Sequence, residues 1–96
     1  MEFEWDEAKN SRNMEKHGVS FETACRIFEG PVLSATDKRH DYGELRTNSI
    51  GAIAGIAFLT VTHTDRASVT RLISARPANR DERKRYDEAI RQRTQP

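Results

Sequence analysis

The sequence has a single cysteine, Cys25, so the chain cannot form a disulfide bond within itself. It also lacks any apolar run near the ~18 residues that a membrane-spanning helix needs. Its opening residues 1–4 are acidic, whereas a secretory signal begins with basic residues. These shortages predict a cytoplasmic protein with no membrane association.

Familiar catalytic motifs are missing as well. The sequence contains no glycine-rich loop of the kind that cradles phosphate and no Gly-x-Ser-x-Gly elbow. The cysteine and the three histidines, His17, His40 and His63, do not have the spacing of a recognised metal site. We therefore expect no metal and no cofactor, and the sequence disfavours nucleotide hydrolysis by a bound metal.

Lysine is scarce: four of the 16 cationic residues are lysine, and the other twelve are arginine. Arginine presents a planar, permanently charged donor fork that suits phosphate. Residues 1–48 carry a net charge of −3 and residues 49–96 a net charge of +4. This basic second half fits an anionic partner, but a solvated surface would have the same composition.

With 96 residues, a mean hydropathy of −0.82 and 32% charged residues, the chain is long enough for one domain, residues 1–96. Its apolar residues are grouped in helical and strand-like patterns, which favours a folded domain over disorder. Residues 2–5 predict a short strand. Asp6 is a suitable N-cap for a polar helix over residues 7–17, and Gly18 is a suitable stop.

A second helix is predicted from Ser20, its N-cap, to about Glu29. Its apolar residues recur at the helical interval: Phe21, Ala24, Cys25 and Phe28. Because Cys25 belongs to this stripe, we expect it to be buried and unreactive.

Four strands are predicted next, at about 32–36, 43–52, 56–64 and 69–76. The short turns between them, 54–55 and 65–68, imply antiparallel neighbours. Pro77 ends the last strand, and Asn79 can cap a final basic helix over about 80–93. The elements together predict an α+β fold.

Metal-free cleavage of RNA is the chemistry that these residues can supply. RNA carries its own nucleophile, the 2′-hydroxyl, so the protein needs a proton acceptor, cations for the phosphate and a donor for the leaving oxygen. His17, between Lys16 and Gly18, is the best acid–base candidate. Alternatively, it could interact with the carbonyls of the helix end. We expect His63 to be structural and His40 to be solvated.

The arginines of the sheet could bind the phosphate. Arg71 and Arg76 bracket the last strand, where regular alternation would place them on opposite faces. They could share a site only through a bulge or a strand end. Arg46 and Arg66 could join either one. Glu44 would lie on the same face as Arg46, as an ion-pair partner or a proton acceptor.

Several short motifs, in order along residues 3–86, carry a resemblance to a known family: Phe3-Glu4-Trp5-Asp6, Lys9, Asn13, Lys16-His17-Gly18-Val19-Ser20-Phe21, Ala24, Phe28, Thr64-Asp65-Arg66, Ile73-Ser74-Ala75-Arg76 and Glu82-Arg83. With them the chain resembles the BrnT toxin family, a branch of the RelE-like ribonuclease toxins. The resemblance implies a RelE-like α+β fold with an N-terminal strand, two helices, an antiparallel sheet of about four strands and a C-terminal helix.

The resemblance also implies a function. It implies that the chain is a toxin that cleaves RNA internally and that a BrnA-type antitoxin neutralises it. It also implies that the toxin binds operator DNA only indirectly, through the antitoxin. The catalytic residues it implies are His17, Arg66 and Arg76, and the RNA-contacting cations it implies are Lys16 and Arg71. We add Arg46 to the RNA-binding residues because of its place on an inner strand. His63 stands where many relatives have an aromatic residue, so it could transfer protons or only fill space.

A second reading is a non-catalytic module. The same arginines could hold nucleic acid or an antitoxin within an operon repressor complex without cutting RNA. The sequence contains no helix-turn-helix signature that would let this chain read DNA by itself.

Overall fold

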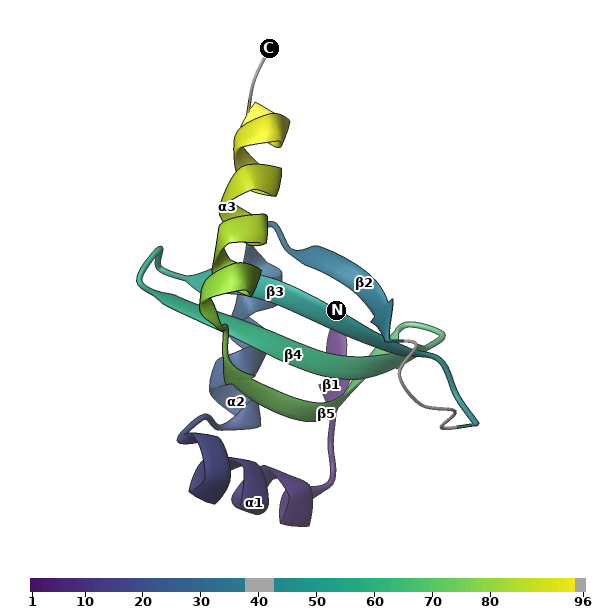
Figure 1. Cartoon of the computed structure of the whole chain (residues 1–96). Helices are drawn as coiled ribbons and strands as arrows, with labels where there is room; N and C mark the ends of the chain where they lie inside the picture. The colour runs from purple at the N-terminus through teal and green to yellow at the C-terminus, as the bar shows by residue number, and fades with distance from the viewer. Residues whose placement is uncertain (38–42, 95–96) are drawn as a thin grey trace.

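The computed structural model describes residues 1–37 and 43–94 and contains five strands, three α-helices and one 3₁₀-helix among them (Figure 1). In chain order these are β1 (Glu2–Glu4), α1 (Glu7–His17), α2 (Phe21–Ala24), the 3₁₀-helix η1 (Cys25–Glu29), β2 (Leu33–Asp37), β3 (Arg46–Ile53), β4 (Ala57–Arg66), β5 (Val69–Pro77) and α3 (Arg80–Thr94). His40, predicted to be solvated, lies outside the described residues. No helix in the described part is long and apolar enough to cross a membrane.

The strands form one mixed sheet in the order β1-β5-β4-β3-β2. β2 to β5 pair antiparallel with their neighbours, as their short connections predicted. The prediction of about four strands in an antiparallel sheet was incomplete, because β1 is a fifth member and runs parallel to β5. Between β1 and β5 the chain forms α1, the continuous α2–η1 segment and three strands. A short connection makes two strands antiparallel, but this long connection leaves the direction of β1 relative to β5 open. The α+β class is confirmed.

The second predicted helix is shorter than expected, since α2 tightens at Cys25 into the 3₁₀-helix η1. Such tightening is common at the end of an α-helix. The hairpin between β3 and β4 turns at Ala54 and Gly55, both with positive φ, 54° and 68°. This geometry matches the twist of the flanking strands.

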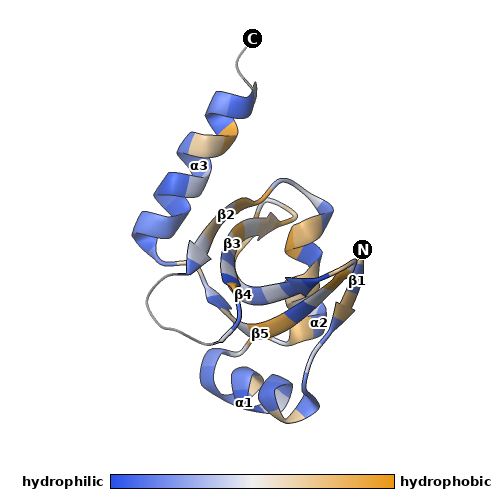
Figure 2. Ribbon diagram, turned by 90° about the vertical axis from the view of Figure 1, so that its right-hand side faces the viewer, coloured by the Kyte–Doolittle hydropathy of each residue, from blue (hydrophilic) through white to orange (hydrophobic). Residues whose placement is uncertain are grey.

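The core lies between one face of the sheet and the segment that contains α2 and η1. Its fully buried members include Phe21, Ile27, Val61 and Leu72. The ribbon in Figure 2 is orange there, whereas α1 and α3 are mostly blue. η1 approaches β3 closely at Gly51, where an added Cβ would lie 2.7 Å from Cβ of Ile27. A glycine is therefore required at that crossing.

Polar side chains attach α1 to this body. Its two buried residues are Asn10 and Asn13, while its largest apolar side chain, Met14, is 50% exposed. The Asn13 amide Nδ2 donates to the carbonyls of Val19 and Ala75, both at 2.8 Å, and Oδ1 accepts from Ala75 N at 3.0 Å. The side chain of Asn13 thus hydrogen-bonds the backbone N–H and C=O of Ala75 on β5, as a neighbouring strand would.

β5 contains a bulge at Ile73. Thr62 pairs with Ser74, but the next residue, His63, pairs with Leu72. A bulge adds one residue to one strand and so shifts the alternation of its side chains. Leu72 and Ala75, three apart, consequently both point into the core.

α3 is anchored to β5 by a carboxylate. Asn79 and Glu82 form reciprocal backbone–side-chain hydrogen bonds at 2.8 and 2.9 Å, which is a capping box. The Arg76 guanidinium donates to both oxygens of Glu82, at 2.6 and 2.8 Å. Further along, the Tyr86 hydroxyl donates to the carbonyl of Pro31 at 3.0 Å. In the last turn, Nη2 of Arg93 donates to the carbonyl of Val32 at 3.0 Å. The axis of α3 points away from the sheet (Figure 1).

We predict that this anchor makes the stability of the protein depend on acid pH. The hydrogen bonds from Arg76 are the main cause that lowers the pKa of Glu82 from 4.5 to about 2. Because the folded-state pKa is the lower one, the stabilisation is complete above about pH 4.5 and is lost as the pH falls toward 2. Between about pH 6 and pH 2, the free energy of unfolding should fall by about 2 kcal/mol more in the wild type than in Glu82→Gln.

Urea denaturation at each pH measures this difference, and other carboxylates titrate alike in both proteins. Glu88→Gln, on the exposed side of the same helix, is the matched control and should keep the wild-type pH dependence. If the free energy of unfolding depended on pH identically in the wild type and in Glu82→Gln, the proposed stabilisation by the Arg76–Glu82 contact would be contradicted.

Candidate active site

A shallow pocket of about 380 Å³ lies between α1 and β5. It is lined by Lys9, Arg12, Asn13, Lys16, His17, Ile73 and Ser74. We call it the α1–β5 pocket. It contains the leading acid–base candidate of the sequence, His17, and its neighbour Lys16.

Helical spacing explains why these side chains meet. Lys9, Arg12 and Lys16 are three and four residues apart, so they share one face of α1. His17 is one turn beyond Asn13, whose amide is fixed on Ala75. The helix then ends at Gly18, with φ of 70°. The hydrogen bonds of Asn13 therefore hold the imidazole of His17, which is partly exposed, beside β5.

The α1–β5 pocket is electropositive. Lys9, Arg12 and Lys16 form no salt bridge with any carboxylate of the described residues. The nearby Asp6 caps α1, and backbone N–H groups of Lys9 and Ala8 are the main cause that lowers its pKa. The charges of Arg12 and Lys9 lower it further.

The donors are wrong for a metal ion. No carboxylate lines the α1–β5 pocket, and the described residues hold no cluster of three or more potential metal ligands. Three cations would repel a divalent ion and attract a phosphate.

The structure places Arg71 and Arg76 on one face of the sheet, because the bulge at Ile73 lies between them. Their partners on β4, Thr64 and Thr60, are four residues apart, which is roughly 13 Å along a strand. Arg71 forms a 2.5 Å salt bridge with Glu4, and Arg76 holds Glu82. Neither arginine lines the α1–β5 pocket.

Arg46 and Arg66 converge on Glu44. Its carboxylate lies 3.6 Å from Nε of Arg46 and 3.3 Å from Nη2 of Arg66, as an ion-pair partner of both. Arg66 is four residues beyond Thr62, the partner of Ser74, and so roughly 13 Å along β4 from the pocket. The structure thus brings together His17 and Lys16, and none of the four predicted arginines is among the residues that line the pocket.

Sequence reasoning gave no site role to Lys9, Arg12, Asn13 and Ser74. The helical spacing of Lys9 and Arg12 from Lys16 could have identified the first two. Asn13 and Ser74 meet only because α1 docks on β5 and the bulge shifts the strand, which no local pattern reveals.

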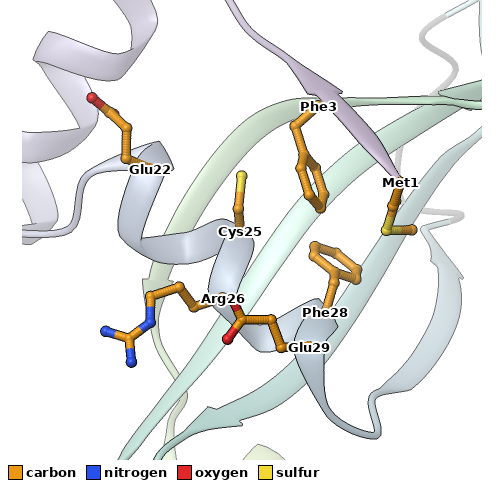
Figure 3. Close-up of a pocket in the computed structure, with 7 residues that line it drawn as sticks. All are labelled: Met1, Phe3, Glu22, Cys25, Arg26, Phe28 and Glu29. Carbon is orange, nitrogen blue, oxygen red and sulfur yellow. The ribbon is translucent and has the colours of Figure 1, made fainter.

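Cys25 lies in a different pocket, of about 340 Å³, beside the rings of Phe3 and Phe28 (Figure 3). It is partly exposed, so the prediction of a buried cysteine was wrong in degree. Burial, and to a lesser extent the charge of Glu22, raises the pKa of its thiol to about 11. The group therefore stays protonated at neutral pH and is a weak nucleophile.

His63 is 4% exposed and does not line the α1–β5 pocket. Its ring is hydrogen-bonded to Ser49 and Asp65, and the Phe28 ring meets it edge-on at 5.3 Å. It fills part of the core, as a structural histidine does.

Comparisons with known proteins identify the family and support the fold. Residues 5–82 match the family model described as "Ribonuclease toxin, BrnT, of type II toxin-antitoxin system". The crystal structure of the Brucella abortus ribonuclease toxin BrnT is similar, with 26% identity and a TM-score of 0.62. The alignment covers 83% of this chain and 99% of that one. No curated protein matched the sequence.

The family model spans most of the chain, from the residue before the cap of α1 to the carboxylate that anchors α3. It therefore includes the whole α1–β5 pocket. The chain belongs to the BrnT family, the ribonuclease toxins of type II toxin–antitoxin systems.

Proposed function

We propose that this chain is an RNA endonuclease that needs no metal and cuts RNA in the α1–β5 pocket. The observation that carries the proposal is the placement of one imidazole beside three cations, with no carboxylate among the lining residues. That set supplies proton transfer and phosphate stabilisation together. Membership of a family of ribonuclease toxins supports RNA as the substrate. Kinship with the RelE-like toxins and action in the cytoplasm are parts of the same proposal.

In the proposed reaction, His17 accepts the proton of an RNA 2′-hydroxyl. The 2′-oxygen then bonds to the adjacent phosphorus, and the bond from phosphorus to the 5′-oxygen breaks. Lys9, Arg12 and Lys16 stabilise the negative charge that grows on the phosphate oxygens. The 5′-oxygen leaves with a proton that an ammonium group of the pocket can donate. The products are a 2′,3′-cyclic phosphate and a 5′-hydroxyl.

We assign the remaining cations to the RNA chain away from the cut. Arg66 and Arg76, catalytic by resemblance, each pair with a carboxylate and do not line the pocket. Arg46 and Arg71 are likewise ion-paired on the sheet. In this proposal these arginines contact neighbouring phosphates by exchanging a carboxylate partner for the nucleic acid.

We predict that His17→Ala lowers the rate of RNA cleavage by about 10²–10⁴-fold, the usual contribution of a general base. The measurement uses purified protein and a defined RNA in the presence of a chelator, with both product ends identified. The wild type should leave a cyclic phosphate with undiminished activity. His63→Phe, which changes a histidine outside the pocket, is the matched control and should cleave RNA normally.

A well-folded His17→Ala protein that cuts at the wild-type rate would remove His17 from the mechanism. Loss of cleavage in chelator would remove the metal-free chemistry. Salt-sensitive binding of RNA without any product would instead identify a non-catalytic binding module.

We predict that the cations of α1 dominate the binding of RNA. Replacing Lys9, Arg12 and Lys16 together by Gln should reduce the slope of log K against log salt by about 0.7 for each phosphate that these side chains neutralise in the wild type. A variant with Gln at Arg80, Lys84 and Arg91 removes the same charge from the outer side of α3. Filter binding of RNA over a salt series measures this slope for both variants. An equal reduction of the slope in the two variants would show that only the overall charge of the protein matters.

The partner in this proposal is a BrnA-type antitoxin, through which operator DNA is bound indirectly. The type II toxin–antitoxin family supports a protein antitoxin. We predict that expression of the toxin alone stops growth and that co-expression of such an antitoxin restores it. Growth curves with and without the antitoxin test this, with His17→Ala as the inactive control. Unimpaired growth without antitoxin would count against a toxin.

A further inference from the structure

Four side chains, none of which lines the α1–β5 pocket, form a continuous hydrogen-bonded chain across three strands. Asp65 and His63 lie on β4, Ser49 on β3 and Ser34 on β2. Oδ1 of Asp65 is 2.9 Å from Nδ1 of His63, and Nε2 of His63 is 2.8 Å from Oγ of Ser49. Oγ of Ser49 is in turn 2.7 Å from Oγ of Ser34. We call these four residues the serine relay.

The middle of the serine relay is closed to water and both ends are open. Ser49 is fully buried, and His63 is 4% exposed. The side chain of Asp65 is 54% exposed, and Ser34 is an exposed residue. A buried hydrogen bond is stronger electrostatically than an exposed one. A change of protonation at one end of the serine relay therefore changes the strength of the hydrogen bonds at the other end.

The chemistry of the groups fixes the direction of the protons. An ionised Asp65 can only accept, so it takes the hydrogen bond of the His63 Nδ1–H group. Nε2 of His63 then accepts from the Ser49 hydroxyl, and Ser49 accepts from Ser34. The order carboxylate, imidazole, hydroxyl is that of a serine hydrolase triad, with one further hydroxyl that reaches the surface.

We propose that Ser34 is a nucleophile that the serine relay activates and that accepts an acyl group from an activated ester. Oγ of Ser34 bonds to the acyl carbon, and the bond from that carbon to the leaving oxygen breaks. The proton of Ser34 passes to Ser49 as the proton of Ser49 passes to Nε2 of His63. Asp65 stabilises the imidazolium, and the leaving oxygen departs as an anion, as an activated ester allows. The extra proton of His63 then passes to water through Asp65, whose side chain is 54% exposed.

The place of Ser34 in the fold suits this reaction. β2 is an edge strand with a partner only on its β3 side in the described sheet, so an ester can approach it. Outward-facing backbone N–H groups of an edge strand can donate to the oxyanion that forms. Three strand spacings, roughly 14 Å, separate β2 from β5, which keeps this centre apart from the α1–β5 pocket.

The test uses p-nitrophenyl acetate with the full chain at neutral pH. Peptide mapping by mass spectrometry measures the rate of acetylation at each residue. Ser34 should be acetylated at least about 100-fold faster than the exposed serines Ser11 and Ser68, the scale of general-base assistance. Ser34→Ala should remove this modification while RNA cleavage is unchanged.

Breaking the serine relay should return Ser34 to the rate of an ordinary serine. We expect this for Ser49→Ala and for His63→Phe, where an aromatic ring of similar size meets Phe28. Asp65→Asn, at an exposed site, should slow acetylation by about tenfold, and it keeps the proposal testable should a core variant fail to fold. Acetylation of Ser34 at the background rate in the wild type, or at an equal rate in folded Ser49→Ala, would overturn the proposal.

Discussion

The contact on which the candidate active site depends is the hydrogen bonding between the Asn13 amide and the backbone of Ala75. It joins residues 62 positions apart through Nδ2 and Oδ1 of Asn13, and Nδ2 also donates to the carbonyl of Val19. Because the attachment is polar, α1 can lie against the sheet edge without an apolar face, and its cations remain outside the core. A helix packed through leucines would have turned an apolar stripe toward β5 where Lys9, Arg12 and Lys16 now surround His17.

The bulge in β5 complements this attachment. Without the extra residue at Ile73, Leu72 and Ala75 could not both point into the core, and Ser74 would turn to the other face. Asn13 takes the outward backbone groups of Ala75, and Ser74 beside it reaches the α1–β5 pocket. One irregular residue in the strand therefore serves both the packing of the core and the lining of the pocket.

The sequence predicted the individual helices, strands and turns better than the contacts between them. The caps at Asp6 and Ser20, the stop at Gly18 and the hairpin at residues 54–55 follow from local chemistry, and the structure contains each one. The parallel pairing of β1, the docking of α1 and the bulge depend on contacts between distant residues. For that reason the sequence could pair His17 with Lys16, whereas the absence of Arg66 and Arg76 from the lining of the same pocket could not be predicted.

The distribution of carboxylates explains which cations remain available to an anion. Glu4, Glu44 and Glu82 neutralise the arginines of the sheet, and this pairing fastens β1 and α3 to the sheet. No described carboxylate forms a salt bridge with the cations of the α1–β5 pocket. A phosphate that enters the pocket displaces no internal partner, while one that binds the sheet has to break an existing ion pair. This difference in free-energy cost supports the proposal that RNA is cut in the pocket and is only bound at the sheet.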